Sequence, residues 1–148
     1  MVIKKLLFLL LILTSSLLLI SCNSVVDSET SSLSSFTSIS PSEFSKFIEQ
    51  DDVVVIDVRQ NIELNDLGYI PQKDLEHDFY SSDFTSFIDS LDKTERYAIY
   101  CYHDTRSGKV MSYMEEQGFE FVVDLDGGID AWLNEGFPVD FPPSSAFN

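Results

Sequence analysis

The chain has 148 residues, 44% of them apolar, and its 25 acidic and 9 basic residues give a formal net charge of -16. This charge excludes a nucleic-acid-binding protein, because contacts to phosphates need a basic surface. The apolar share excludes an intrinsically disordered chain. With 2 cysteines and 2 histidines, the chain has too few ligands for a zinc finger or an iron–sulfur ferredoxin, and we expect no metal site. The class that remains is a small acidic globular domain.

The N-terminal segment has the pattern of an export signal. Lysines precede an uncharged apolar run over residues 6–20, which is shorter than the roughly 20 residues that a helix needs to cross a bilayer. The tetrapeptide Leu-Ile-Ser-Cys at residues 19–22 resembles the lipobox of bacterial lipoproteins. This resemblance implies a signal peptide over residues 1–21 and a lipid attached to the sulfur of Cys22. An uncleaved signal anchor with an incidental cysteine is the alternative.

A Ser-rich segment follows the signal. Residues 22–38 contain few large apolar side chains, so they cannot bury enough surface to offset their ordering entropy. They are predicted to form the lipidated cysteine and a flexible tether. We expect a folded domain over residues 39–142 and a C-terminal tail over residues 143–148. The protein would then be exported and anchored by lipid at the cell envelope, on the periplasmic or extracellular side.

The domain alternates predicted helices and strands. Apolar residues at helical spacing predict helices, whereas short uninterrupted apolar blocks predict strands that are buried on both faces. Strands separated by helices predict a three-layer α/β/α fold with a central parallel sheet. Residues 61–78 show no clear period and are predicted to be a loop with at most one helical turn. The predicted helices are 40–48, 84–91, 106–117 and 129–135, and the predicted strands are 53–56, 97–100 and 121–123.

Cys101 directly follows a predicted strand and precedes a predicted helix. In parallel sheets, ligands bind beyond the carboxyl ends of the strands. A strand–loop–helix turn offers inward-pointing backbone N–H groups and the positive end of a helix, which together stabilise a thiolate nucleophile. Arg106 closes the loop, and we expect its guanidinium to face the anion that the sulfur engages. The alternative is an inert core cysteine.

The chain resembles the rhodanese family of sulfurtransferases over nearly the whole predicted domain. The resemblance rests on blocks that occur in order with plausible spacing, at residues 55–59, 100–108, 116–119, 125–132 and 136–139. It implies a rhodanese-like fold and a sulfurtransferase that moves a sulfane sulfur through a persulfide on Cys101. The donor would be thiosulfate or a thiol persulfide, and the acceptor a thiol or cyanide. No organic cofactor is implied. The length of the Cys-x4-Arg loop is associated in this superfamily with sulfur transfer rather than with phosphate chemistry.

The resemblance also implies roles for other residues. Cys101 and Arg106 would be catalytic, and Asp57 and Arg59 would brace the active loop through an ion pair. The substrate-binding residues would be those of the loop, namely Tyr102, His103, Asp104, Thr105 and Ser107.

The sequence departs from the family pattern at a few positions. Asp104 stands where the family often has glycine, and its carboxylate near the loop would repel anionic donors. The sequence therefore does not establish whether the protein uses thiosulfate as a donor. The segment at residues 68–73 also differs from the usual motif. These departures leave a second function open, a non-catalytic binding or redox-sensing module at the membrane. We expect a monomer, and the sequence does not identify a protein partner.

Overall fold

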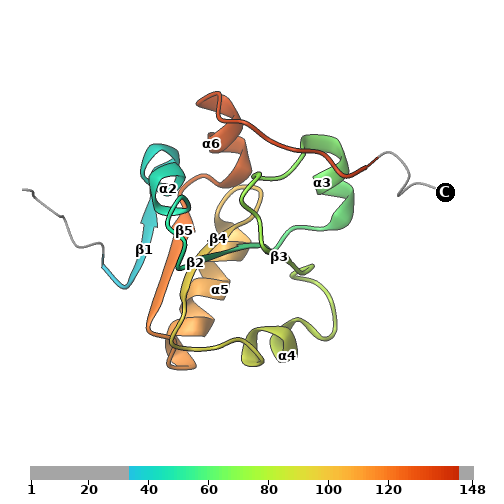
Figure 1. The fold of residues 1–148 in the computed structure, drawn as a ribbon. Coiled ribbons are helices and arrows are strands. Elements are labelled where there is room, and N and C mark those ends of the chain that lie inside the picture. The colour runs from blue at the N-terminus through green and yellow to red at the C-terminus, as the bar shows by residue number, and fades with distance from the viewer. Residues whose placement is uncertain (1–33, 144–148) are drawn as a thin grey trace, which may run out of the picture. The chain divides into compact units, whose positions relative to one another are not determined.

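The computed structural model describes residues 34–143, which contain a five-stranded sheet (Figure 1). The strand order is β1-β5-β4-β2-β3, and all neighbouring strands run parallel. The predicted central parallel sheet is therefore confirmed. The strands are β1 (Phe36–Ile39), β2 (Val53–Asp57), β3 (Leu75–Glu76), β4 (Arg96–Tyr100) and β5 (Phe121–Leu125).

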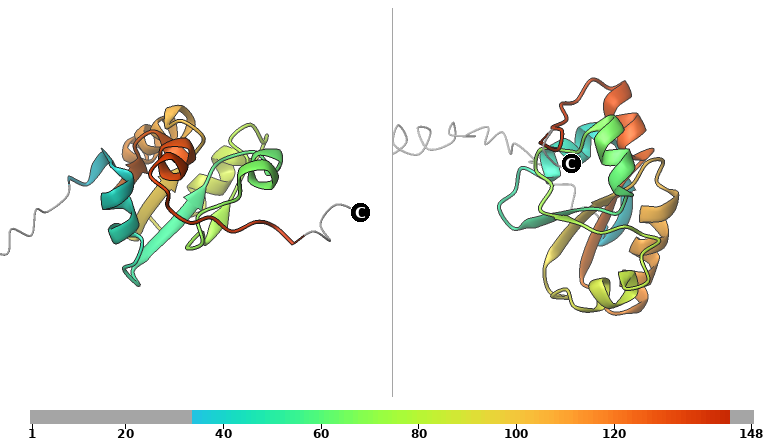
Figure 2. Two further views of the ribbon diagram at one scale, coloured as in Figure 1. Left: turned by 90° about the horizontal axis from the view of Figure 1, so that it is seen from above. Right: turned by 90° about the vertical axis from the view of Figure 1, so that its right-hand side faces the viewer.

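Helices cover both faces of the sheet (Figures 1 and 2), and they are α2 (Pro41–Phe47), α3 (Asn61–Leu67), α4 (Phe84–Asp89), α5 (Thr105–Glu116) and α6 (Gly128–Asn134). Successive side chains of a strand point to opposite faces. Ala98 and Tyr100 of β4 therefore share an apolar cluster with α2 and α6, whereas Tyr97 and Ile99 share another with α4 and α5. The predicted three-layer arrangement is confirmed. Cys101 continues this alternation and lies on the α4 and α5 face.

The start of α2 has a capping box. The Glu43 N–H donates to Ser40 Oγ at 3.4 Å, and the Ser40 N–H donates to the Glu43 carboxylate at 3.1 Å. Each residue thereby satisfies a donor that the first turn of a helix would otherwise leave unpaired.

The segment 61–78 is not the predicted loop, because it contains α3 and the short strand β3. Leu64 is the only buried side chain of α3, so this helix has too little apolar periodicity for the sequence pattern to reveal it. Gly68 ends the helix with φ 73°, where a Cβ would lie 2.6 Å from the carbonyl oxygen of Asp140. A glycine is required at this position because the C-terminal segment passes so close to it.

Strand β1 begins inside the predicted tether. Residues 36–38 pair in parallel with β5, with Phe36 opposite Val122, so the tether prediction is wrong for these residues. An edge strand that contains Thr37 and Ser38 lacks the continuous apolar block by which the other strands were recognised. The predicted signal peptide at residues 1–21 and the predicted lipidation site at Cys22 lie outside the described residues. Between residues 34 and 143, no helix has the length and apolar character needed to span a membrane.

Candidate active site

Cys101 lies at the carboxyl end of β4, against the first turn of α5. The residue exposes 1% of its surface, and the Ser107 hydroxyl donates a hydrogen bond to its sulfur at 3.3 Å. The thiol is free in this structure. The sulfur therefore has apolar neighbours from the sheet on one side and a polar contact from the helix on the other.

The loop after Cys101 presents unpaired backbone donors. The carbonyl groups of Cys101 and Tyr102 accept hydrogen bonds from the N–H groups of Ile129 and Asp130, at 2.9 and 3.2 Å, at the start of α6. Because a trans peptide holds its C=O and N–H on opposite sides, the next N–H groups along the loop point away from α6. Within residues 34–143, no acceptor pairs with the N–H groups of residues 102–107. These donors and the start of α5 create a site for an anion.

Gly128 makes this contact between loop and helix possible. Its φ is 62°, and a Cβ at this position would lie 2.4 Å from the carbonyl oxygen of Tyr102. No side chain fits at that distance, so only glycine lets α6 approach the loop closely enough to bind its carbonyl groups. The buried side chains of Ile129 and Trp132 fix α6 on the sheet.

Asp104 adopts the left-handed conformation that the loop requires, with φ 69°. Its side chain does not cap α5. Instead, one carboxylate oxygen accepts the Gly127 N–H at 3.3 Å, and the Asp104 carbonyl accepts the Gly108 N–H at 2.7 Å. The Asp104 carboxylate therefore does not bind the backbone N–H groups at the start of α5, next to Cys101.

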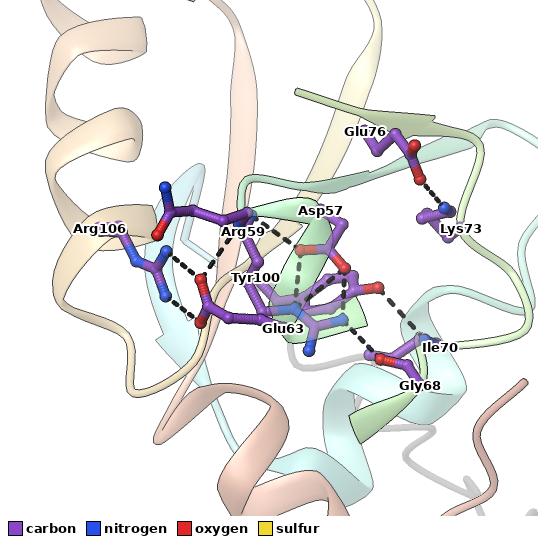
Figure 3. A network of polar contacts seen from close by, with 10 residues as sticks. Asp57, Arg59, Glu63, Gly68, Ile70, Lys73, Glu76, Tyr100 and Arg106 are labelled. Carbon is purple, nitrogen blue, oxygen red and sulfur yellow. Dashed lines mark hydrogen bonds and ion pairs between the residues drawn. The ribbon is translucent and has the colours of Figure 1, made fainter. Parts of the chain in front are cut away.

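Arg106 is bound by a carboxylate that the sequence interpretation did not identify. Its Nη1 and Nη2 donate to the two oxygens of Glu63 at 2.7 and 2.6 Å (Figure 3). This ion pair is the main cause of the raised pKa of Arg106. Burial alone would raise the pKa of Glu63, but the hydrogen bonds from Arg106 and from the Gln60 backbone lower it. The guanidinium is therefore held by Glu63 of α3, a contact that the sequence did not predict, and the charge of Cys101 is a lesser cause of its raised pKa.

The sequence contains one weak indication that Glu63 has a structural role. It stands three residues after Gln60, which is the spacing of a capping box, and its Oε2 accepts the Gln60 N–H at 3.1 Å. The same carboxylate thus starts α3 and joins it to α5.

Asp57 and Arg59 form a buried ion pair, but they contact a different segment from the one expected. Both side chains are fully buried, and the Nη2 of Arg59 lies 2.6 Å from Oδ2 of Asp57. The same Nη2 donates to the Gly68 carbonyl at 2.7 Å, and the Ile70 N–H donates to the Tyr100 hydroxyl at 3.2 Å (Figure 3). The pair thus holds the segment after α3 against the sheet rather than the loop that follows Cys101.

The remaining loop residues form the rim of the site. His103 is exposed and packs against the ring of Tyr102 at 4.0 Å between centroids, and Thr105 is exposed. Of the predicted substrate-binding residues, Ser107 is the one with a hydrogen bond to the Cys101 sulfur. In the part of the chain that the structure describes, no group of three or more His, Cys, Asp or Glu side chains is arranged to hold a metal ion.

Known proteins resemble this chain over the same region. Residues 40–135 match the model of the rhodanese-like domain family. The thiosulfate sulfurtransferase GlpE of Actinobacillus pleuropneumoniae serotype 7 is 30% identical over 105 residues, which are 71% of this chain and 94% of that protein.

Two solved structures extend this comparison. A rhodanese-related protein from Thermoplasma volcanium is 28% identical, with a TM-score of 0.62, and the match covers 72% of this chain and 100% of that one. A rhodanese-like domain protein from Staphylococcus aureus is 33% identical, with a TM-score of 0.57, over 70% of this chain and 98% of that one. The matched region of the family model runs from α2 to α6 and includes the loop at Cys101.

Proposed function

Because the chain belongs to the rhodanese-like domain family, we propose that it is a sulfurtransferase that carries a sulfane sulfur on Cys101. One observation supports this role above the others. The Cys101 sulfur lies at the start of α5, beside backbone N–H groups that have no acceptor within residues 34–143. Such fixed donors stabilise negative charge on sulfur without the reorganisation that water would need.

The proposed reaction has two steps. In the first, the Cys101 thiolate attacks the outer sulfur of the donor, so that a new S–S bond forms and the donor's S–S bond breaks. The bond's electron pair leaves with the remainder of the donor, which is sulfite when the donor is thiosulfate. In the second step, a thiolate or cyanide attacks the outer sulfur of the persulfide, and the electron pair of the broken bond returns to Cys101. The N–H groups of residues 102–107 would bind the negative outer sulfur between the two steps.

The charge of the chain favours a donor that carries less negative charge than thiosulfate. The formal net charge is -16, and the Asp104 carboxylate lies at the loop. Both repel a dianion such as thiosulfate. Because Arg106 is neutralised by Glu63, it does not offset this repulsion. We therefore propose that a thiol persulfide is a better donor than thiosulfate.

We further propose that the protein is exported and lipid-anchored through Cys22. The support is the sequence of residues 1–22, with its basic start, uncharged apolar run and lipobox-like tetrapeptide. Mass spectrometry of the wild-type protein should show a mature N-terminus that begins at Cys22 and carries lipid, whereas a Cys22→Ala variant should carry no lipid and keep residues 1–21. A wild-type protein in the membrane fraction with residues 1–21 intact would instead have an uncleaved signal anchor.

Mass spectrometry tests the sulfur transfer directly. The full chain is treated with thiosulfate or with a small thiol persulfide, and the peptide that contains Cys101 should gain one sulfur atom, which cyanide then removes. A Cys101→Ser variant is the control, since it should gain no sulfur on this peptide. If no donor changes the mass of the wild-type peptide, the chain is the non-catalytic binding or redox-sensing module.

A further inference from the structure

Asp124 is a buried acid that the proposed reaction does not use. It exposes 1% of its surface. In the register of the sheet, it is paired with Ser38 of β1 on one side and with Ile99 of β4 on the other. The Ser38 hydroxyl donates to its Oδ2 at 3.3 Å. Its Oδ1 is buried and has no hydrogen-bond partner within residues 34–143. A buried carboxyl with a free oxygen is costly to a fold, so its presence calls for an explanation.

The carboxyl lies on the same face of the sheet as Cys101. Val122 packs in the cluster under α4 and α5, whereas Val123 and Leu125 pack under α2 and α6, so the alternation of β5 places Asp124 under α5. A Cβ built on Gly108 would lie 3.8 Å from its Oδ2. The side chain therefore lies against the first turn of α5, where it lines a cavity of about 610 Å³ together with Asp104 and Thr105.

Ser107 contacts the sulfur and belongs to the turn of α5 that lies against this carboxyl. Its hydroxyl donates to Cys101 Sγ at 3.3 Å and lies 3.2 Å from the Asp104 carbonyl. The next residue, Gly108, faces Asp124 Oδ2, and the Ser107 side chain lowers the pKa of Asp124. A hydroxyl has one proton to donate but can accept as well. Ser107 can therefore accept from a protonated Asp124 while it donates to a thiolate, or donate to an ionised Asp124.

The surroundings keep Asp124 protonated to an unusually high pH. Burial raises its pKa to about 7, against the opposing hydrogen bonds from Ser107 and Ser38. The charges of Asp104 and Asp126 raise this pKa further. Other titratable groups that line the same cavity lie on α5, and they are Lys109, Tyr113 and Glu116.

We propose that Asp124 is a positioning residue that exchanges a proton with Cys101 through the Ser107 hydroxyl, so that the three side chains share one negative charge. The thiol proton passes to Ser107 Oγ, and the Ser107 proton passes to the carboxylate. The thiolate then forms beside a neutral acid, with a hydrogen bond from Ser107. This inference rests on the proposed function, because it concerns the same sulfur.

The shared charge matches the two steps of the proposed reaction. After the first step, the Cys101 sulfur is bonded to a second sulfur and is no longer an anion, so Asp124 can ionise. In the second step, Cys101 leaves as a thiolate, and a proton on Asp124 stabilises this leaving group through Ser107. No oxidant or reductant is needed.

The rate of alkylation at Cys101 tests the proposal without any sulfur donor. The full chain is treated with iodoacetamide, a neutral electrophile, at pH 5 to 10, and the Cys101 peptide is followed by mass spectrometry. In Asp124→Asn, the midpoint of this pH profile should move to lower pH by roughly one unit, because an ionised neighbour no longer opposes the thiolate. In a Ser107→Ala background, the same substitution should move the midpoint by less than half as much.

Two further variants keep the result interpretable. Asp126→Asn removes a nearby exposed carboxylate without touching Ser107, and because its charge is the smallest cause of the raised pKa of Asp124, it should move the midpoint much less than Asp124→Asn. Ser38→Ala removes a hydrogen bond to Asp124 and should move the midpoint in the same direction as Asp124→Asn, so it serves if that variant does not fold. An unchanged midpoint in Asp124→Asn, or an equal shift in Asp126→Asn, would overturn the proposal. A failure of sulfur transfer would not alter these profiles, so the two proposals fail separately.

Discussion

Arg106 and Glu63 join α5 to α3 through a two-pronged ion pair, with N–O distances of 2.7 and 2.6 Å. This pair fixes the first turn of α5, the turn that also contains Ser107. Because the guanidinium is neutralised by Glu63, the attraction of the site for an anion arises from backbone N–H groups. Arg106 therefore acts mainly through the position of the loop, and its charge also interacts with that of Cys101.

We expect Arg106→Lys to weaken both the fold and the reaction. Lysine cannot donate to both oxygens of Glu63 in one plane, so the free energy of unfolding should fall by about 1–2 kcal/mol and sulfur transfer should slow roughly tenfold. Urea unfolding and a thiol persulfide assay measure the two effects. Arg96→Lys is the matched control, since Arg96 pairs with Asp52 at the opposite end of β4 from Cys101 and should retain full transfer activity. Equal transfer rates in Arg106→Lys and wild type would contradict this role.

Asp57→Asn should destabilise the protein more than any change at the rim of the site. The substitution leaves the Arg59 guanidinium buried without a counter-charge, and Arg59 Nη1 already lacks a partner within residues 34–143. Breaking a buried ion pair in this way costs about 3–5 kcal/mol, which urea unfolding would measure. Glu76→Gln, which breaks an exposed ion pair with Lys73, should be nearly neutral. A loss below about 1 kcal/mol in Asp57→Asn would show that the pair does not hold the segment after α3.

Gly128→Ala should remove activity because the added Cβ would lie 2.4 Å from the Tyr102 carbonyl oxygen. The loop must then move away from α6, which turns its N–H groups out of position. Gly136→Ala is a matched control: its φ of 80° is equally unfavourable for alanine, but no atom lies within 4 Å of the new Cβ. The control isolates the backbone cost of about 1–2 kcal/mol. Persulfide formation should persist in Gly136→Ala and disappear in Gly128→Ala, and its survival in both would exclude the steric argument.

Much of this architecture could be predicted because it depends on local apolar patterns. The blocks at residues 53–56 and 97–100 gave their strands, and the position of Cys101 after the second block placed it at the carboxyl end of the sheet. Strand β1 and helix α3 escaped prediction because their side chains are mixed and partly exposed. Their places depend on partners far along the chain.

The partners of individual polar side chains could not be predicted. No sequence pattern links Arg106 to Glu63, since the two residues are 43 positions apart and the pattern of residues 61–78 predicts a loop instead of α3. The role of Asp124 was equally hidden, because a single acid in an apolar strand does not reveal which helix covers it. Long-range contacts of this kind follow from the packing of layers and not from a local period.

Asp104→Gly should improve the use of thiosulfate. Glycine adopts φ 69° without strain, and the substitution removes a carboxylate from the loop next to Cys101. The KM for thiosulfate should fall several-fold, with a weaker dependence on salt, while the KM for a thiol persulfide, which carries less negative charge, should change much less. Asp130→Asn, at the exposed side of His103, is the control for a general loss of charge. An equal improvement in both variants would mean that the overall charge, and not Asp104, limits thiosulfate.

The buried carboxyl of Asp124 should make the fold less stable as the pH rises from 4 to 7. Its pKa is about 7 in the folded chain and starts from an ordinary value of 3.8, so in this window the folded state holds a proton that the unfolded state has released. The resulting stabilisation is fully present below about pH 4 and is lost as the pH passes through about 7. It should amount to about 2–4 kcal/mol.

Urea unfolding of wild type and of Asp124→Asn at several pH values isolates this contribution. The other carboxyl groups contribute equally to the free energy of unfolding of both chains, so the difference between the two free energies reports on Asp124. The variant should gain stability relative to wild type as the pH increases, whereas Asp126→Asn should follow wild type. Parallel pH profiles for wild type and Asp124→Asn would show that Asp124 has the same pKa in the folded and unfolded chains, so the fold would not hold the proton that we assign to it.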